Sequence, residues 1–92
     1  MAVRAKQRPD LELLVRSREG VIFADVVDSV TSRNSKGVFD ILPGHANFIT
    51  LLNDILIIRP KGSKRDAQHR IKVSNGILRN LNNRIEVYIG VK

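Results

Sequence analysis

The sequence of 92 residues carries 16 lysines and arginines against 9 aspartates and glutamates, a formal net charge of +7, and no cysteine. Its length is that of one domain, and 42% hydrophobic with 27% charged residues excludes a disordered chain. The lack of cysteine excludes disulfides and thiolate metal sites, and no apolar run approaches the roughly 20 residues of a membrane-spanning helix.

The chain begins with a basic segment and then changes to the pattern of a β-protein. Residues 1–10 contain no apolar core, so we predict a flexible basic arm rather than a secretory signal. Leu11, Leu13 and Val15 alternate with residues of the opposite face, which predicts a strand over residues 11–16.

The rest of the chain predicts short strands separated by turns, and no stretch has helical periodicity. In the first half we expect a turn at 17–20, one bent strand or two short ones over 21–30, and a polar loop at 31–37. A strand over 48–52, a turn at 53–54, a short strand over 55–58 and a basic loop should follow. The second half predicts a strand over 70–73, a break at 74–76, a strand over 77–81, a turn at 81–83 and a last strand over 84–92.

The last strand has the clearest pattern. Its apolar residues should face inward and the others outward: Ile85, Val87, Ile89 and Val91 against Arg84, Glu86, Tyr88 and Lys92. Strands at this spacing favour a sandwich or a barrel, and we predict an all-β, two-sheet β-sandwich of about eight to ten short strands.

Residues 42–46, here named the corner, read Leu-Pro-Gly-His-Ala and stand between two apolar runs. Pro43 fixes its φ and lacks an N–H, and Gly44 permits positive φ, so the pair suits the centre of a type II turn. His45 follows at the exit of the turn. The residues alone leave two interpretations open, an ordinary turn or an interaction surface, and they favour the turn.

No catalytic motif is recognisable. His45 and His69 are far apart in sequence and lack acidic partners at metal-ligand spacing. The nucleophile-elbow and P-loop patterns are absent. Asp25 and Asp28, three residues apart on an extended strand, point to opposite faces and make a poor acid–base pair. We therefore expect no enzyme activity of the chain itself, no metal and no cofactor.

Residues 59–72 hold six lysines and arginines and one aspartate. A solvated hairpin tip is the usual explanation of such a run, and an electrostatic contact is the alternative. The charge also leaves open a small basic β-barrel that binds nucleic acid. The chain has only four aromatic residues, and Phe23, Phe39 and Phe48 lie in apolar runs, so the stacking platform of a single-strand binder is missing.

The corner and its surroundings resemble the signature of the epsilon chain of F-type ATP synthases, the delta chain in mitochondrial naming. Gly37, Phe39, residues 41–46 and Thr50 stand in the register of that signature. Ser74-Asn75-Gly76, followed by Ile77-Leu78, is similar to the family's Ser-Gly-Gly before a strand. Two residues depart from the pattern: Asp40 replaces a usual glycine and Asn47 a usual proline.

The resemblance implies the family's N-terminal β-sandwich over residues 11–92, without the C-terminal helices that usually follow it. It also implies a non-catalytic rotor subunit that binds the gamma chain and couples the membrane rotor ring to the catalytic head during proton- or sodium-driven ATP synthesis. Such a chain would be a peripheral membrane protein on the cytoplasmic face of a bacterial plasma membrane, with no nucleic-acid partner.

The resemblance further implies two sets of contact residues. The gamma-chain interface would comprise the corner with supporting residues: Leu42, Pro43, Gly44, His45, Ala46, Thr50, Ser74, Asn75 and Gly76. A second set would face the rotor ring, where the basic run could also meet acidic ring loops or lipid headgroups: Ser32, Lys36, Gly37, Val38, Lys61, Lys64 and Arg65.

Overall fold

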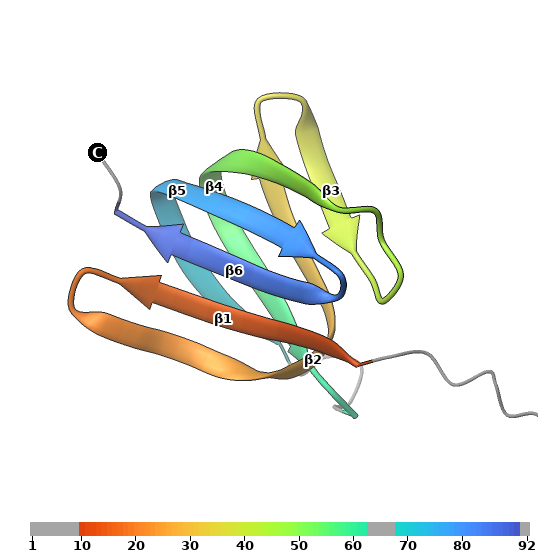
Figure 1. Cartoon of the computed structure of the whole chain (residues 1–92). Helices are drawn as coiled ribbons and strands as arrows, with labels where there is room; N and C mark the ends of the chain where they lie inside the picture. The colour runs from red at the N-terminus through yellow and green to blue at the C-terminus, as the bar shows by residue number, and fades with distance from the viewer. Residues whose placement is uncertain (1–9, 63–67, 91–92) are drawn as a thin grey trace, which may run out of the picture.

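The computed structural model describes residues 10–62 and 68–90, and this part of the chain consists of six strands joined by turns and short connections (Figure 1). The strands are β1 (Leu11–Ser17), β2 (Gly20–Asn34), β3 (Gly37–Ile41), β4 (Phe48–Pro60), β5 (His69–Leu81) and β6 (Arg84–Ile89). The predicted all-β fold is confirmed. Within the described ranges no helix is long and apolar enough to cross a membrane. All of the predicted N-terminal arm except Asp10 lies outside the described residues.

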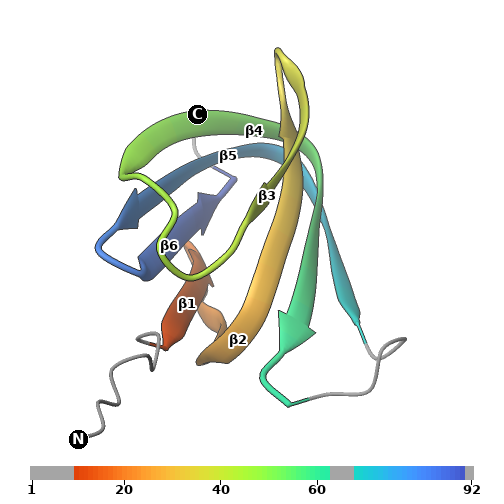
Figure 2. The same cartoon turned by 90° about the vertical axis from the view of Figure 1, so that its right-hand side faces the viewer.

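The strands form one sheet that closes on itself. Their order is β1-β6-β5-β4-β2-β3, and β1 also pairs with β2. β1 runs parallel to β6, with Leu13 beside Ile85, and antiparallel to β2, with Leu13 beside Asp25. The closed sheet is flattened into the two layers of a β-sandwich (Figures 1 and 2).

Three strands are long, and they explain why the described chain has six strands where eight to ten short ones were predicted. β2 spans 15 residues, and β4 and β5 span 13 each. The β2–β4 register shifts between Val27 and Ser29, and the β4–β5 register between Leu52 and Asp54. Such bulges bend a strand without ending it, so each long strand contributes to both layers.

Three predicted breaks are therefore wrong. Residues 74–76 lie inside the continuous strand β5, which carries the bulge at Ser74 and Asn75. Residues 53–54 lie inside β4 opposite this bulge, and residues 31–34 of the predicted polar loop belong to β2, which leaves only Ser35 and Lys36 as the turn. The physical reason is that the polar side chains have cross-strand partners. Arg33 lies 3.5 Å from the Asp54 carboxylate, and Asn34 donates a hydrogen bond of 3.0 Å to Thr50 Oγ1.

The core lies between the two layers and confirms the predicted alternation of the first and last strands. Leu11, Leu13 and Val15 of β1, and Ile85 and Val87 of β6, are all at most 2% exposed. The other buried apolar residues are Val27, Val30, Ile41, Leu52, Leu56, Ile58, Val73 and Leu78. The three phenylalanines are half-buried and pack against this core, and Ile89 does the same. Val91 and Lys92 lie outside the described residues.

Two leucines of β4 provide a matched test of this core. Leu56 is fully buried, whereas Leu51 is 70% exposed. We expect Leu56→Ala to lower the free energy of unfolding by about 2–5 kcal/mol, because it leaves a cavity. Leu51→Ala should change it by no more than about 0.5 kcal/mol. Urea unfolding of both variants measures the difference, and equal effects would contradict the assignment of the core.

Gly76 offers a second test, at the bend of β5. A Cβ atom on this buried glycine would lie 3.0 Å from both the carbonyl oxygen of Tyr88 and Cγ1 of Val73. Gly76→Ala should therefore destabilise the fold by about 1–3 kcal/mol through overpacking. The exposed neighbour Ser74 supplies the control, since Ser74→Ala should be nearly neutral in the same unfolding experiment. A G76A variant as stable as S74A would refute the close approach.

Candidate interaction surface

The corner forms the predicted turn. The backbone N–H of His45 donates to the carbonyl oxygen of Leu42 over 3.1 Å, and Gly44 has a φ of 89°. A hydrogen bond between the first and fourth residues with positive φ at the third is the geometry of a type II turn. The turn ends β3 and sends the chain into β4 at Phe48.

Four asparagines join this turn to the β5–β6 hairpin, and we name Asn47, Asn80, Asn82 and Asn83 the asparagine clamp. Asn83 Oδ1 accepts the backbone N–H of Gly44 at 2.7 Å. Asn47 Oδ1 accepts the N–H of Asn82 at 2.7 Å. Asn80 of β5 donates from Nδ2 to the carbonyl oxygens of Ala46 at 3.0 Å and His45 at 3.4 Å. The clamp thus connects segments more than thirty residues apart.

The hairpin itself depends on the same residue type. Asn82 and Asn83 have φ values of 50° and 66°. A two-residue turn with positive φ at both positions is the type I′ hairpin turn, for which asparagine is among the best residues. Asn47, which stands where the family usually has proline, contacts this turn through its side chain. The other departure, Asp40, accepts a hydrogen bond from the hydroxyl of Thr31 on the neighbouring strand.

His45 is exposed and held from two sides. Its ring centroid lies 5.0 Å from that of Phe48, and Nδ1 lies 2.9 Å from the carbonyl oxygen of Ala46. Because a carbonyl only accepts, Nδ1 carries the proton in this contact. The ring is therefore presented at the surface in a defined orientation.

An exposed apolar strip covers the outer face of β4, β5 and β6 beside the corner. We define it as Ile49, Leu51, Ile77, Leu81 and Tyr88; Ile49 is 68% exposed and Leu51 70%. Leu51 lies directly opposite Ile77, and Ile77 opposite Tyr88, so these side chains form one row across three strands. The Arg79–Glu86 ion pair lies on the same face, between this row and Leu81. Exposed apolar surface beside a few charged groups is typical of an interaction site.

Sequence analysis missed most of this strip, although a signal was present. Phe48 and Leu52 face the core side of β4, while Ile49 and Leu51 alternate with them on the outer side. A strand that is apolar on both faces is expected to be covered on both. Within the described residues nothing covers the outer face, so the strip is free for a partner.

Two hollows flank the strip. The first, of about 460 Å³, is next to the corner and is lined by Asn47, Phe48, Ile49, Arg79, Asn80 and Leu81. The second, also about 460 Å³, brings together Thr50 and Ser74–Gly76 with Ser35 of the β2–β3 turn. Asn75 precedes Asn80 by five residues, roughly 17 Å along an extended strand. Thr50 and residues 74–76 thus form a patch of their own, away from the corner that they were expected to support.

The residues expected to face a rotor ring do not lie together. Lys36, Gly37 and Val38 are at the tip of the β2–β3 hairpin, where Val38 is 63% exposed. Ser32 is only 1% exposed, and its Oγ donates to the carbonyl oxygen of Ile55 at 2.8 Å. Its inclusion in a contact surface was wrong, because this hydroxyl faces inward and ties β2 to β4.

Lys61 lies at the other end of the molecule. Its backbone N–H donates to Val26, which precedes the end of β2 at Asn34 by eight residues, roughly 26 Å of strand. In Figure 2 the β2–β3 hairpin and the C-terminal end of β4 occupy opposite ends. Lys64 and Arg65 lie outside the described residues.

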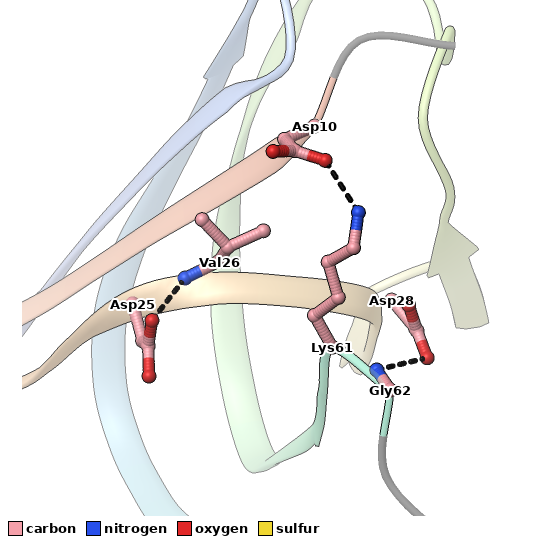
Figure 3. Close-up of polar contacts among 6 residues, drawn as sticks. All are labelled: Asp10, Asp25, Val26, Asp28, Lys61 and Gly62. Carbon is pink, nitrogen blue, oxygen red and sulfur yellow. Dashed lines mark hydrogen bonds and ion pairs between the residues drawn. The ribbon is translucent and has the colours of Figure 1, made fainter. Parts of the chain in front are cut away.

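The surroundings of Lys61 are acidic (Figure 3). Its ammonium group lies 2.6 Å from an oxygen of Asp10, and this hydrogen bond raises the pKa of Lys61 above its ordinary value. Asp28 accepts the N–H of Gly62 at 3.2 Å, and Asp25 that of Val26 at 2.7 Å. The two aspartates thus bind separate backbone groups. In residues 10–62 and 68–90, no three histidine or carboxylate side chains gather into a metal site.

Comparison with known proteins agrees with this architecture. The sequence profile of a family described as "ATP synthase, Delta/Epsilon chain, beta-sandwich domain" matches residues 10–90. An ATP synthase epsilon chain from Endomicrobium trichonymphae is 35% identical over 78 residues, which cover 83% of this chain and 53% of that protein. One from Campylobacter concisus is 42% identical over 58 residues, covering 62% of this chain and 45% of its own length.

Solved structures share the fold at lower identity. A chain of the Euglena gracilis mitochondrial ATP synthase, solved as OSCP/F1/c-ring, aligns with a TM-score of 0.77 at 20% identity, over 96% of this chain and 56% of that one. A chain of the Tetrahymena thermophila mitochondrial ATP synthase central stalk/c-ring aligns with a TM-score of 0.71 at 13% identity, over 91% and 66%.

The chain spans about half the length of the curated relatives it matches. The profile nevertheless covers the whole described part, from the last residue of the arm to the residue after β6. The predicted resemblance is confirmed: this chain belongs to the family of ATP synthase delta/epsilon chains through its β-sandwich domain.

Proposed function

We propose that this chain is a non-catalytic subunit of the central stalk of an F-type ATP synthase. In this role it binds the gamma chain and helps to couple the membrane rotor ring to the catalytic head during proton- or sodium-driven ATP synthesis. The observation that carries the proposal is the family match over residues 10–90. The complex would place the chain on the cytoplasmic face of a bacterial plasma membrane, as a peripheral component.

The gamma chain contacts the corner and the exposed apolar strip. Two properties of this surface support the assignment. The strip offers apolar area that is uncovered in the described chain. The corner is a fixed turn, and it leads through Asn47 into the start of β4, where the strip begins at Ile49. Apolar anchors beside a few oriented polar groups are typical of protein interfaces.

A coupling subunit must transmit force without deforming. The closed sheet supports this requirement, because close-packed interiors have low compressibility and transmit strain. β1 has a pairing partner on each side, so the first strand of the chain cannot move independently of the last.

The rotor ring contacts the tip of the β2–β3 hairpin. We choose this end over the end at Lys61 because the hairpin presents Val38 and Lys36 without an acidic neighbour among the described contacts, whereas Asp10 already binds the Lys61 ammonium. If the hairpin tip and the Lys61 end both contacted one flat partner, most of β2, which lies between them, would have to lie along that partner.

Binding to the gamma chain tests the first contact. His45→Asp introduces a charge where an oriented ring meets the partner, and we expect the affinity for the gamma chain of the same organism to fall at least tenfold, about 1.4 kcal/mol. Co-purification and calorimetric titration measure the complex. The control is His69→Asp, since His69 is also exposed and stacks on Phe23 at 5.8 Å but lies at the far end of β5.

A folded wild-type chain that binds no gamma chain would refute the proposal. If both histidine variants weakened gamma-chain binding equally, the corner would not be the interface. If no gamma chain binds, the salt dependence of nucleic-acid binding tests the alternative of a nucleic-acid-binding protein. A protein that neutralises several phosphates loses affinity steeply as salt rises.

Two exposed valines of β2 and β3 test the ring contact. Val38→Lys places a charge in an apolar contact, so we expect about tenfold weaker association of the reconstituted gamma-chain complex with isolated rotor ring. Val21, 57% exposed near the start of β2, supplies the control, and Val21→Lys should have no effect. Sedimentation of the complex with ring-containing vesicles measures the association. If the Val21 variant weakened association with the ring and the Val38 variant did not, the β2–β3 hairpin would not be the end that meets the ring.

A further inference from the structure

Asn80 is a buried amide one residue before the end of β5. It lies in β5 between Phe48 of β4 and Ile85 of β6, and only 1% of its surface is exposed. A strand position that is buried and flanked by apolar residues is ordinarily occupied by an apolar side chain. An amide at this position loses its hydration, and only hydrogen bonds within the protein compensate for that loss.

The hydrogen bonds of Asn80 compensate for the lost hydration of its amide nitrogen but not of its amide oxygen. Both neighbours of its side chain, at 3.0 Å and 3.4 Å, are carbonyl oxygens, of Ala46 and His45. Carbonyls only accept, so the amide nitrogen must face them. Oδ1 then points away from the corner, and it has no hydrogen-bond partner within the described parts of the chain. A buried acceptor without a partner destabilises the folded state.

The two sides of this amide respond differently to its removal. The acceptors on the corner belong to exposed residues, and Ala46 also accepts from Nδ1 of His45, so water can replace the amide there. The unpartnered oxygen would vanish with the amide. An apolar residue at position 80 is therefore expected to stabilise the sandwich, while the corner would lose its attachment to β5.

The remaining clamp contacts cannot substitute for Asn80. The bonds of Asn83 to Gly44 and of Asn47 to Asn82 are exposed. Water competes with exposed hydrogen bonds, and their net contribution is small. The bonds of Asn80 come instead from a side chain that is 1% exposed and therefore fixed in the core. Of the four asparagines, Asn80 is the one that ties the corner to the core.

We propose that Asn80 is a positioning residue, which holds the corner in the orientation presented to the partner and lowers the stability of the sandwich by doing so. Where the partner is concerned, the inference rests on the proposed gamma-chain contact. A buried polar group that is poorly satisfied but fixes a surface turn is expected at functional sites, where local rules are broken. The fixed turn removes an ordering cost from binding.

The test replaces the amide in the complete chain with Asn80→Val and uses three readouts. We expect the thermal midpoint to stay at or above that of the wild type. Hydrogen exchange of the Gly44 and His45 amides, both hydrogen-bonded in the corner, should be at least tenfold faster, while the β6 amides keep their protection. The dissociation constant for the gamma chain should rise at least fivefold.

Asn83→Gly is the matched variant. Glycine keeps the positive φ that this turn position requires and removes only the side-chain acceptor for Gly44. It should loosen the same amides without raising the midpoint, because it removes no buried unpartnered atom. Asn80→Leu, which keeps the branching at Cγ, replaces the valine variant if that variant does not fold.

Two results would overturn the inference. Wild-type exchange at Gly44 and His45 in Asn80→Val would show that the amide does not hold the corner. A midpoint lowered as far as in Leu56→Ala would make Asn80 a residue of the stable core. Faster exchange with unchanged gamma-chain affinity would instead overturn the corner as the interface, and with it the role of Asn80 in binding; exchange in the free chain separates these failures.

Discussion

The pairing of β1 with two strands is the constraint on which the rest of the structure depends. β1 bonds to β2, the next strand in the chain, and to β6, the last one. This closure removes the free edges that β1 and β6 would otherwise have. It also encloses the apolar faces of both strands, so that Val15, Ile85 and Val87 are fully buried. The ring of β1, β6, β5, β4 and β2 closes around so small a core only if some strands bend.

The bends determine where the candidate surface lies. The bulge at Ser74 and Asn75 of β5 lies opposite Asn53. It divides β4 into a half near the corner and a half that also pairs with β2. The first half carries Ile49 and Leu51 on its outer face, beside the corner and the β5–β6 hairpin. The candidate interface is thus built on strands of the closed sheet, and only the turn itself requires further attachment.

Sequence analysis predicted the strands whose two faces differ in polarity. Leu11, Leu13 and Val15 are buried, and the residues between them are less buried, with Leu14 as the one apolar member. Ile85 and Val87 alternate with more polar and more exposed residues in the same way. It failed at residues 31–34 and 53–54, where polar residues suggested a loop and a turn. These residues are extended because Arg33 meets Asp54 and Asn34 meets Thr50. Contacts over 16 residues or more leave no local signal in the sequence.

The candidate surface shows the same division between local and distant causes. Pro43 and Gly44 determine the turn locally, and its type was predictable. Asn80 was not, because residues 77–81 were predicted only as a strand, and its partners at the corner lie 34 and 35 residues away. Ile49 and Leu51 were predicted only as strand residues, since a strand that is apolar on both faces does not show which face packs on the core.

The ion pair at Lys61 and the Asn80 contact at the corner differ in how they respond to the solvent. The Asp10–Lys61 ion pair is exposed on both sides, and salt screens such pairs. The hydrogen bond to Asp10 raises the pKa of Lys61, so the stability that the lysine charge contributes is lost as the pH rises through that raised value. The Asn80 contact is neutral and partly buried, so neither salt nor pH in that range alters it. Of the two contacts, the Asn80 contact therefore keeps its geometry when ionic conditions change, which is what a lasting interface at the corner would require.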